Sequence, residues 1–118
     1  MAAYKILVDA MGGDYAPKAP VEGALIALER HSDLSIVIAG REPEIRKALE
    51  GKSYDAGRLQ ILHKEQVVEN EEHNPAEAVR AKKDSSLMYG MKMVKEKEVD
   101  GLVSAANTGA VLAGATLI

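Results

Sequence analysis

The chain has 118 residues, of which 47% are hydrophobic and 28% charged, with a formal net charge of −3 and a pI of about 5.6. This balance is typical of one globular domain, and the negative charge argues against a general binder of nucleic acid or anionic membranes. Four Tyr and no Phe or Trp leave few side chains on which bases could stack. The absence of cysteine excludes disulfides and thiolate chemistry, and is consistent with a cytoplasmic protein.

Strand and helix patterns alternate along the first half of the chain. The runs YKILVDA (4–10), LSIVIAG (34–40) and RLQILH (58–63) are short and apolar, which predicts three buried strands. After the first strand, apolar residues at helical spacing predict a helix that ends near Arg30. The segment EPEIRKALEG predicts a second, shorter helix with Pro43 in its first turn.

The second half carries two helix-start signals. Asn74, Pro75 and Glu77 form the pattern of an N-cap, a first-turn proline and a capping box. The segment KKDSSL then interrupts the helical pattern, which predicts a further helix capped by one of three residues, Asp84, Ser85 or Ser86. We expect that helix to turn three side chains inward, those of Leu87, Met91 and Val94.

The last stretch, residues 101–118, contains no charged residue and so meets the bare length rule for a membrane span. Its polar cluster and three glycines instead favour a fourth strand, VDGLVSA (99–105), that leads into a fourth crossover helix. The alternation predicts an α/β fold, one domain over residues 1–118, with right-handed crossovers onto a mostly parallel sheet. Because the chain stops inside an apolar helix without a cap, we expect it to be the N-terminal portion of a longer protein.

The first polar cluster lies where the first strand gives way to a helix, and comprises Asp9, Gly12, Gly13 and Asp14. The two carboxylates would bind a metal, act as acid and base, or fix the loop by accepting backbone N–H bonds. With no other metal-type ligand nearby, the pattern favours the structural role. The glycines indicate a turn that needs positive φ or close backbone approach.

The second polar cluster follows the fourth strand, in the segment SAANTGA. Ser104, Asn107 and Thr108 offer hydroxyl and amide groups, and Gly109 allows close backbone approach at the helix start, so a nest for phosphate or another oxyanion is one interpretation. The other is an ordinary helix cap. The segment matches neither the P-loop, since the lysine is absent, nor the dinucleotide fingerprint.

A basic patch precedes the capping serines, in the segment AVRAKKDSS. Lys82 and Lys83 lie beside Ser85 and would hold phosphate or an acidic protein partner. A solvated helix face explains the same residues.

Three stretches together resemble the phosphate acyltransferase family of bacterial phospholipid synthesis: VDAMGGDYAPKAPVEGA (8–24), AVRAKKDSSL (78–87) and VSAANTGAVLAGA (103–115). The resemblance implies a Rossmann-like three-layer α/β/α sandwich with a mostly parallel sheet, similar to phosphotransacetylase and isocitrate dehydrogenase-like folds. It also implies a cytoplasmic or membrane-peripheral homodimer that transfers a fatty acyl group from acyl carrier protein to inorganic phosphate, forming acyl phosphate. No cofactor or metal and no nucleic acid would take part.

On this resemblance both polar clusters line the active cleft. Asn107, Thr108 and Gly109 would hold phosphate or the oxyanion, and Asn107 and Lys83 are the candidate catalytic residues. The family pattern reads SAGNTGA, so Ala106 stands where the family has a glycine. Two alternatives remain: a phosphotransacetylase-like acyltransferase that uses coenzyme A, and a non-catalytic fragment that binds phosphate or a partner.

Overall fold

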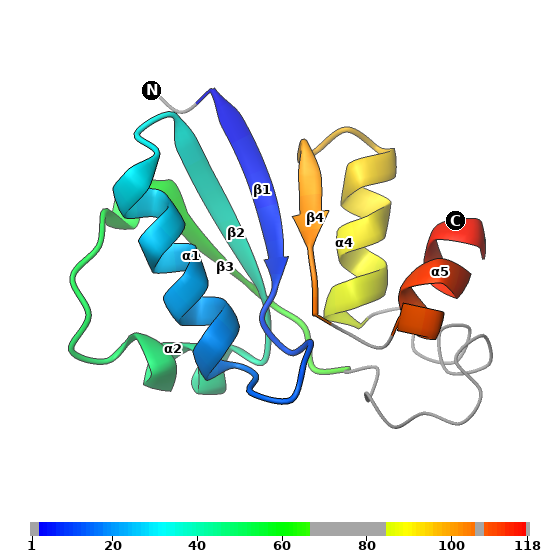
Figure 1. Ribbon diagram of the computed structural model, residues 1–118, viewed down its shortest axis with the longest axis horizontal. Helices are drawn as coiled ribbons and strands as arrows, with labels where there is room; N and C mark the ends of the chain where they lie inside the picture. Colours follow the sequence, from blue (N-terminus) through cyan, green and yellow to red (C-terminus); the bar gives the residue numbers. More distant parts are fainter. Residues whose placement is uncertain (1–2, 67–84, 106–107, 118) are drawn as a thin grey trace.

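The computed structural model describes residues 3–66, 85–105 and 108–117 (Figure 1). The described elements, in chain order, are β1 (Tyr4–Asp9), α1 (Lys18–Arg30), β2 (Leu34–Gly40), α2 (Glu42–Leu49), the short 3-10 helix η1 (Ala56–Arg58), β3 (Leu59–His63), α4 (Ser86–Lys95), β4 (Gly101–Val103) and α5 (Thr108–Leu117). All four predicted strands are present, the last of them shorter than predicted. The helix start predicted at Asn74 lies outside the described residues.

The four strands form one sheet in the order β3-β2-β1-β4, and every pair is parallel. Val8 of β1 is in register with Ile38 on one side and with Val103 on the other. The predicted α/β fold with its parallel sheet is therefore confirmed.

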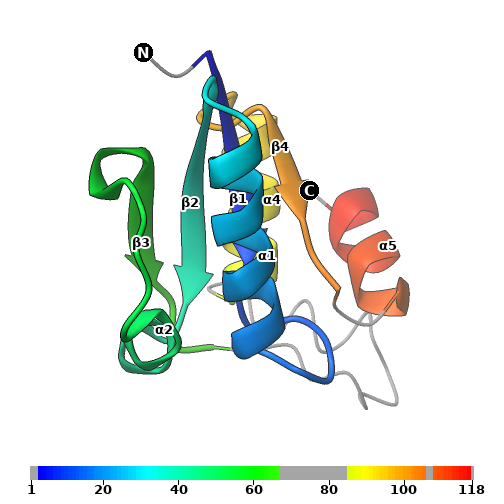
Figure 2. The ribbon, with the colours of Figure 1, turned by 60° about the vertical axis from the view of Figure 1, so that its left-hand side comes forward.

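Alternation along the strands divides the core between the two faces of the sheet. Val8, Ile36 and Ile38 pack with α1 and α2 in one buried cluster. Leu7 and Val37 are each adjacent in sequence to these residues and therefore point to the opposite face of the sheet. There they belong to a second cluster, which includes Met93 of α4. Figure 2 shows α1 in front of β1 and α4 behind it, which gives the three layers of an α/β/α sandwich.

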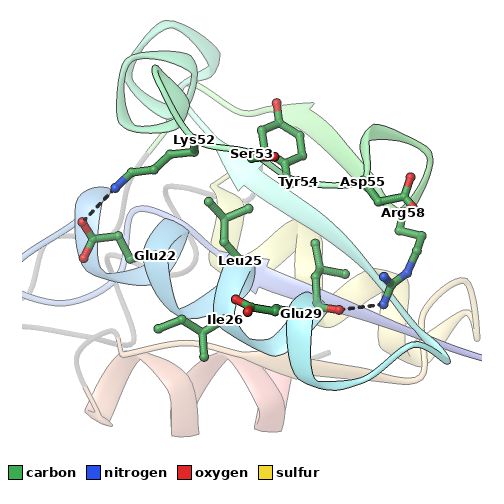
Figure 3. A pocket seen from close by; sticks show the side chains of 10 residues that line it. Glu22, Leu25, Ile26, Glu29, Lys52, Ser53, Tyr54, Asp55 and Arg58 are labelled. Atoms are coloured by element: carbon green, nitrogen blue, oxygen red, sulfur yellow. Dashed lines mark hydrogen bonds and ion pairs between the residues drawn. The ribbon is translucent and has the colours of Figure 1, made fainter.

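The end of α1 is held by a side chain from η1. The Arg58 guanidinium donates to the carbonyl oxygen of Leu28 at 3.0 Å (Figure 3). It also donates to the carbonyl oxygens of Leu34, at 2.9 Å, and His31. These carbonyls lie at or just beyond the last turn of the helix, where intrahelical donors run out. Arg58 thus joins α1 to β2 and to the start of β3.

Burial along α4 is concentrated in its first turns. Leu87 and Met91 are buried as predicted, but Val94 is 36% exposed, so its predicted inward position is wrong. Met88 is buried instead, because the first turns of α4 contact both the sheet and α5, whereas Val94 belongs to the last turn. A Cβ on Gly90 would lie 2.8 Å from Leu7 Cδ2, so this glycine lets α4 approach the sheet closely.

Within the described ranges, none of the helices is both long enough and apolar enough to cross a bilayer. The uncharged stretch that raised this question is divided between β4 and α5.

Replacing Arg58 by Ala should lower the free energy of unfolding by about 1–2 kcal/mol, because carbonyls at the end of α1 lose a charged donor. Urea denaturation of the chain followed by circular dichroism measures this. The control is Arg46→Ala, which removes an exposed ion pair with Glu42 and should change stability by less than about 0.5 kcal/mol. Equal losses in the two variants would contradict the capping role.

Replacing Gly90 by Ala should leave the chain about 1–2 kcal/mol less stable than the same change at Gly23, since the gain in helix propensity is common to both sites and only at Gly90 does the new methyl group overpack against Leu7. Gly23→Ala is the matched control in α1, because nothing lies within 4 Å of a Cβ built there. That variant should gain about 0.5–1 kcal/mol from helix propensity alone. A Gly90→Ala protein as stable as Gly23→Ala would refute the close approach.

Candidate functional site

The carboxyl ends of β1 and β4 lie side by side at the point where the chain changes faces of the sheet. β1 leads to α1 on one face, whereas α5, which follows β4, contacts α4 on the other face. Open parallel sheets bind ligands outside the strand ends at such a switch point. Both polar clusters of the sequence follow these two strands.

The Asp9 carboxylate is the centre of this region. Its Oδ1 accepts a hydrogen bond from Ser86 Oγ at 2.5 Å and one from the Met11 backbone N–H at 3.0 Å. Its Oδ2 accepts from Ser104 Oγ at 2.8 Å. Asp9 is 3% exposed, so the carboxylate is enclosed by the groups that bind it.

These contacts join the end of β1, the start of α4 and the segment after β4. A buried carboxylate is costly unless donors surround it, so the three segments stabilise one another through it. The geometry makes Asp9 a structural clamp of the site. Its oxygens are committed to fixed protein donors, which leaves little acceptor capacity for a metal or a reacting proton.

The glycine turn lies against the segment after β4. Gly13 has φ +92°, and a Cβ built on it would lie 3.1 Å from the Cβ of Ala105. Positive φ and close approach are therefore both present at Gly13, as predicted for this turn. Gly12 is buried and Asp14 is exposed in the same loop.

The other predicted site residues fall into two groups. Ser85 is fully buried and caps α4, its hydroxyl oxygen accepting from the Met88 N–H at 3.2 Å. Thr108 and Gly109 are the first two residues of α5. Three candidates lie outside the described residues: Asn107, Lys82 and Lys83.

Ser86 is the site residue that the sequence interpretation missed, because it was considered only as a helix cap. A signal was present in β1: Asp9 alternates with Val8 and shares a face with Leu7, which is the face covered by α4. The first residue of α4 is therefore well placed to meet Asp9. That signal could be used only once the order of the strands in the sheet was known.

An apolar groove opens beside the clamp, and we call it the α1 groove. It has a volume of about 590 Å³ and runs between α1 and the β1–β4 edge of the sheet. Its floor and walls include Ile6, Val8, Gly23, Ala27 and Val103. Its lining also includes polar-cluster residues, namely Asp9, Gly12, Gly13, Asp14 and Ser104.

A second cavity, of about 780 Å³, lies between α1 and residues 52–58 (Figure 3). Several of its charged groups are engaged: Lys52 Nζ lies 3.8 Å from Glu22 Oε1, Asp55 Oδ1 accepts from the Gly57 N–H at 2.9 Å, and Arg58 caps α1. None of the predicted site residues that the structure describes lines it.

The carboxyl ends of β2 and β3, in the other half of the sheet, carry polar groups that pair with nearby residues. His63 Nδ1 accepts from the Glu42 N–H at 3.0 Å, and Arg41 Nε donates to the Glu65 carbonyl oxygen at 3.0 Å. In the part of the chain that the structure describes, no three His, Asp or Glu side chains are grouped to hold a metal ion. The β1–β4 edge is therefore the best candidate site.

The chain also matches a family of known proteins. The family model described as fatty acid synthesis protein matches residues 4–118, which includes both polar clusters. The chain belongs to this family.

Curated relatives carry the name phosphate acyltransferase. The Dictyoglomus turgidum protein is 51% identical over 113 residues, which is 96% of this chain and 33% of the relative. The Clostridium tetani protein is 49% identical over 114 residues, or 97% of this chain and 34% of the relative. The chain thus spans about a third of the length of these relatives.

Replacing Asp9 by Asn should lower the free energy of unfolding by about 2–3 kcal/mol, because the amide keeps only one acceptor oxygen and places an N–H donor where the other carboxylate oxygen accepts. Chemical denaturation measures the loss, with Asp33→Asn, an exposed carboxylate away from the site, as the matched control. A loss no larger than that of the control would show that the clamp is dispensable for stability.

Proposed function

We propose that the protein to which this chain belongs transfers a fatty acyl group from acyl carrier protein to inorganic phosphate, forming acyl phosphate. Two findings support the proposal: the family, and the name phosphate acyltransferase carried by its relatives. The observation that carries it in the structure is the Asp9 clamp, which joins the segment before α5 to the start of α4. Two helix N-termini, at Ser86 and Thr108, thereby belong to one edge of the sheet.

Helix N-termini favour anions because their first N–H groups are free and the helix dipole is positive there. In the proposed reaction a phosphate oxygen forms a bond to the thioester carbonyl carbon, the C–S bond breaks, and the thiol leaves with a proton. The site has to hold a phosphate dianion in line and stabilise the developing oxyanion. No enzyme nucleophile is needed, which suits a chain segment without cysteine.

We assign roles on that basis. Asn107, Thr108 and Gly109 hold phosphate or the oxyanion, and Lys82 and Lys83 contribute positive charge toward phosphate or toward the acidic carrier protein. Asp9 acts as a positioning residue rather than a catalytic one, and the loop through Asp14 forms the neighbouring wall. The resemblance to the family supports a cytoplasmic homodimer that associates peripherally with the membrane.

Replacing Asn107 by Ala should lower phosphate-dependent formation of acyl phosphate by about 10²–10³-fold, the usual cost of losing one oxyanion donor. The assay uses a protein of full family length, made by joining residues 1–118 to the remaining two thirds of the Dictyoglomus turgidum relative. Thermal melting establishes that the variant folds. Unchanged turnover would refute the role of Asn107.

The same assay with acyl carrier protein and coenzyme A thioesters distinguishes the alternatives. Preference for the coenzyme A thioester would favour a phosphotransacetylase-like enzyme. Phosphate binding without turnover of either thioester would favour a non-catalytic role.

A further inference from the structure

The α1 groove has the chemical character of a site for a hydrocarbon chain. Side chains from both walls are apolar, with Ile6, Val8 and Val103 from the sheet and Ala27 from α1. Small residues along α1 leave the space open, and nothing lies within 4 Å of a Cβ built on Gly23. The volume of about 590 Å³ falls in the range of small-molecule sites.

The groove is continuous with the polar edge described above. Gly13, Ser104 and Ala105 line it at the carboxyl ends of β1 and β4. Figure 1 shows α1 beginning at this edge and running back along the sheet, and the α1 residues that line the groove extend from Ala19 in its first turn to Ala27 near its end. The eight steps along the helix from Ala19 to Ala27 correspond to about 12 Å of groove.

Among the described residues, none covers part of the apolar strand surface along the groove. Val8 and Ile36 are 8% and 3% exposed beneath α1, whereas Val103, on the same face of the neighbouring strand, is 59% exposed. A ligand in the groove would remove this surface from water.

We propose that the α1 groove receives the acyl chain of the thioester substrate, with the carbonyl at the mouth beside Gly13 and Ser104. This inference rests on the proposed function and adds the place where the chain binds. Each methylene buried in such a groove is worth about four-fold in affinity. The groove should therefore raise the affinity for thioesters with long acyl chains and have little effect on the affinity for those with short chains.

Filling the groove at Gly23 tests the proposal. In the full-length protein defined above, Gly23→Leu should lower kcat/KM for hexadecanoyl-acyl carrier protein at least ten-fold, and that for butanoyl-acyl carrier protein less than two-fold. Glu29→Leu is the matched control, because it places a leucine at an exposed position of α1 outside the groove, and both substrates should stay within two-fold of the parent protein.

The outcomes separate the two proposals. Equal losses for both chain lengths, as expected if the rest of a longer polypeptide packs in the groove, would overturn the groove assignment and leave the proposed function standing. Unchanged turnover of the long-chain substrate would also overturn it. Failure of the parent protein to turn over either substrate would refute the proposed function instead.

Photolabelling of the parent protein gives a readout that needs neither a folded variant nor turnover. Hexadecanoic acid that carries a diazirine near its methyl end should label peptides that contain residues 18–30 or 101–105, and excess unlabelled hexadecanoic acid should reduce this labelling. Labelling confined to other peptides would overturn the proposal.

Discussion

The arrangement at the carboxyl edge of the sheet depends on one buried carboxylate. Asp9 accepts from Ser86, 77 residues away, from Ser104, 95 residues away, and from the nearby Met11 N–H. Burying a charge is tolerable only when fixed donors replace the water it loses. The end of β1, the start of α4 and the segment after β4 are therefore held together, because each supplies part of that replacement.

Alternation along the strands explains why these groups meet. Leu7 and Asp9 lie on the face of the sheet that α4 covers, whereas Val8 lies on the face covered by α1. On the neighbouring strand, Leu102 packs with the α4 face and Val103 is in register with Val8. A shift of one residue in this pairing would turn the apolar side chains to the wrong faces and separate Ser104 from Asp9.

Local patterns predicted most of the fold because they need only neighbouring residues. The apolar runs of β1 and β2 and the helical spacing before Arg30 were sufficient for the strands, for α1 and for the parallel sheet. Contacts between distant segments were not predictable in this way. The caps made by Arg58 and the bond from Ser86 to Asp9 depend on the order of strands, and the exposure of Val94 depends on where α4 meets the sheet and α5.

The same alternation gives the candidate site two chemically different sides. Where β1 ends, successive positions supply an apolar side chain to the α1 groove at Val8 and a carboxylate to the polar clamp at Asp9. The two substrates that we propose, a phosphate dianion and a thioester with a hydrocarbon chain, would require both environments within a short distance. The parallel register of β1 and β4 brings them together, since Val103 and Ser104 repeat the same apolar and polar order on the next strand. The register of this parallel pair therefore places the apolar groove and the polar clamp side by side at the switch point.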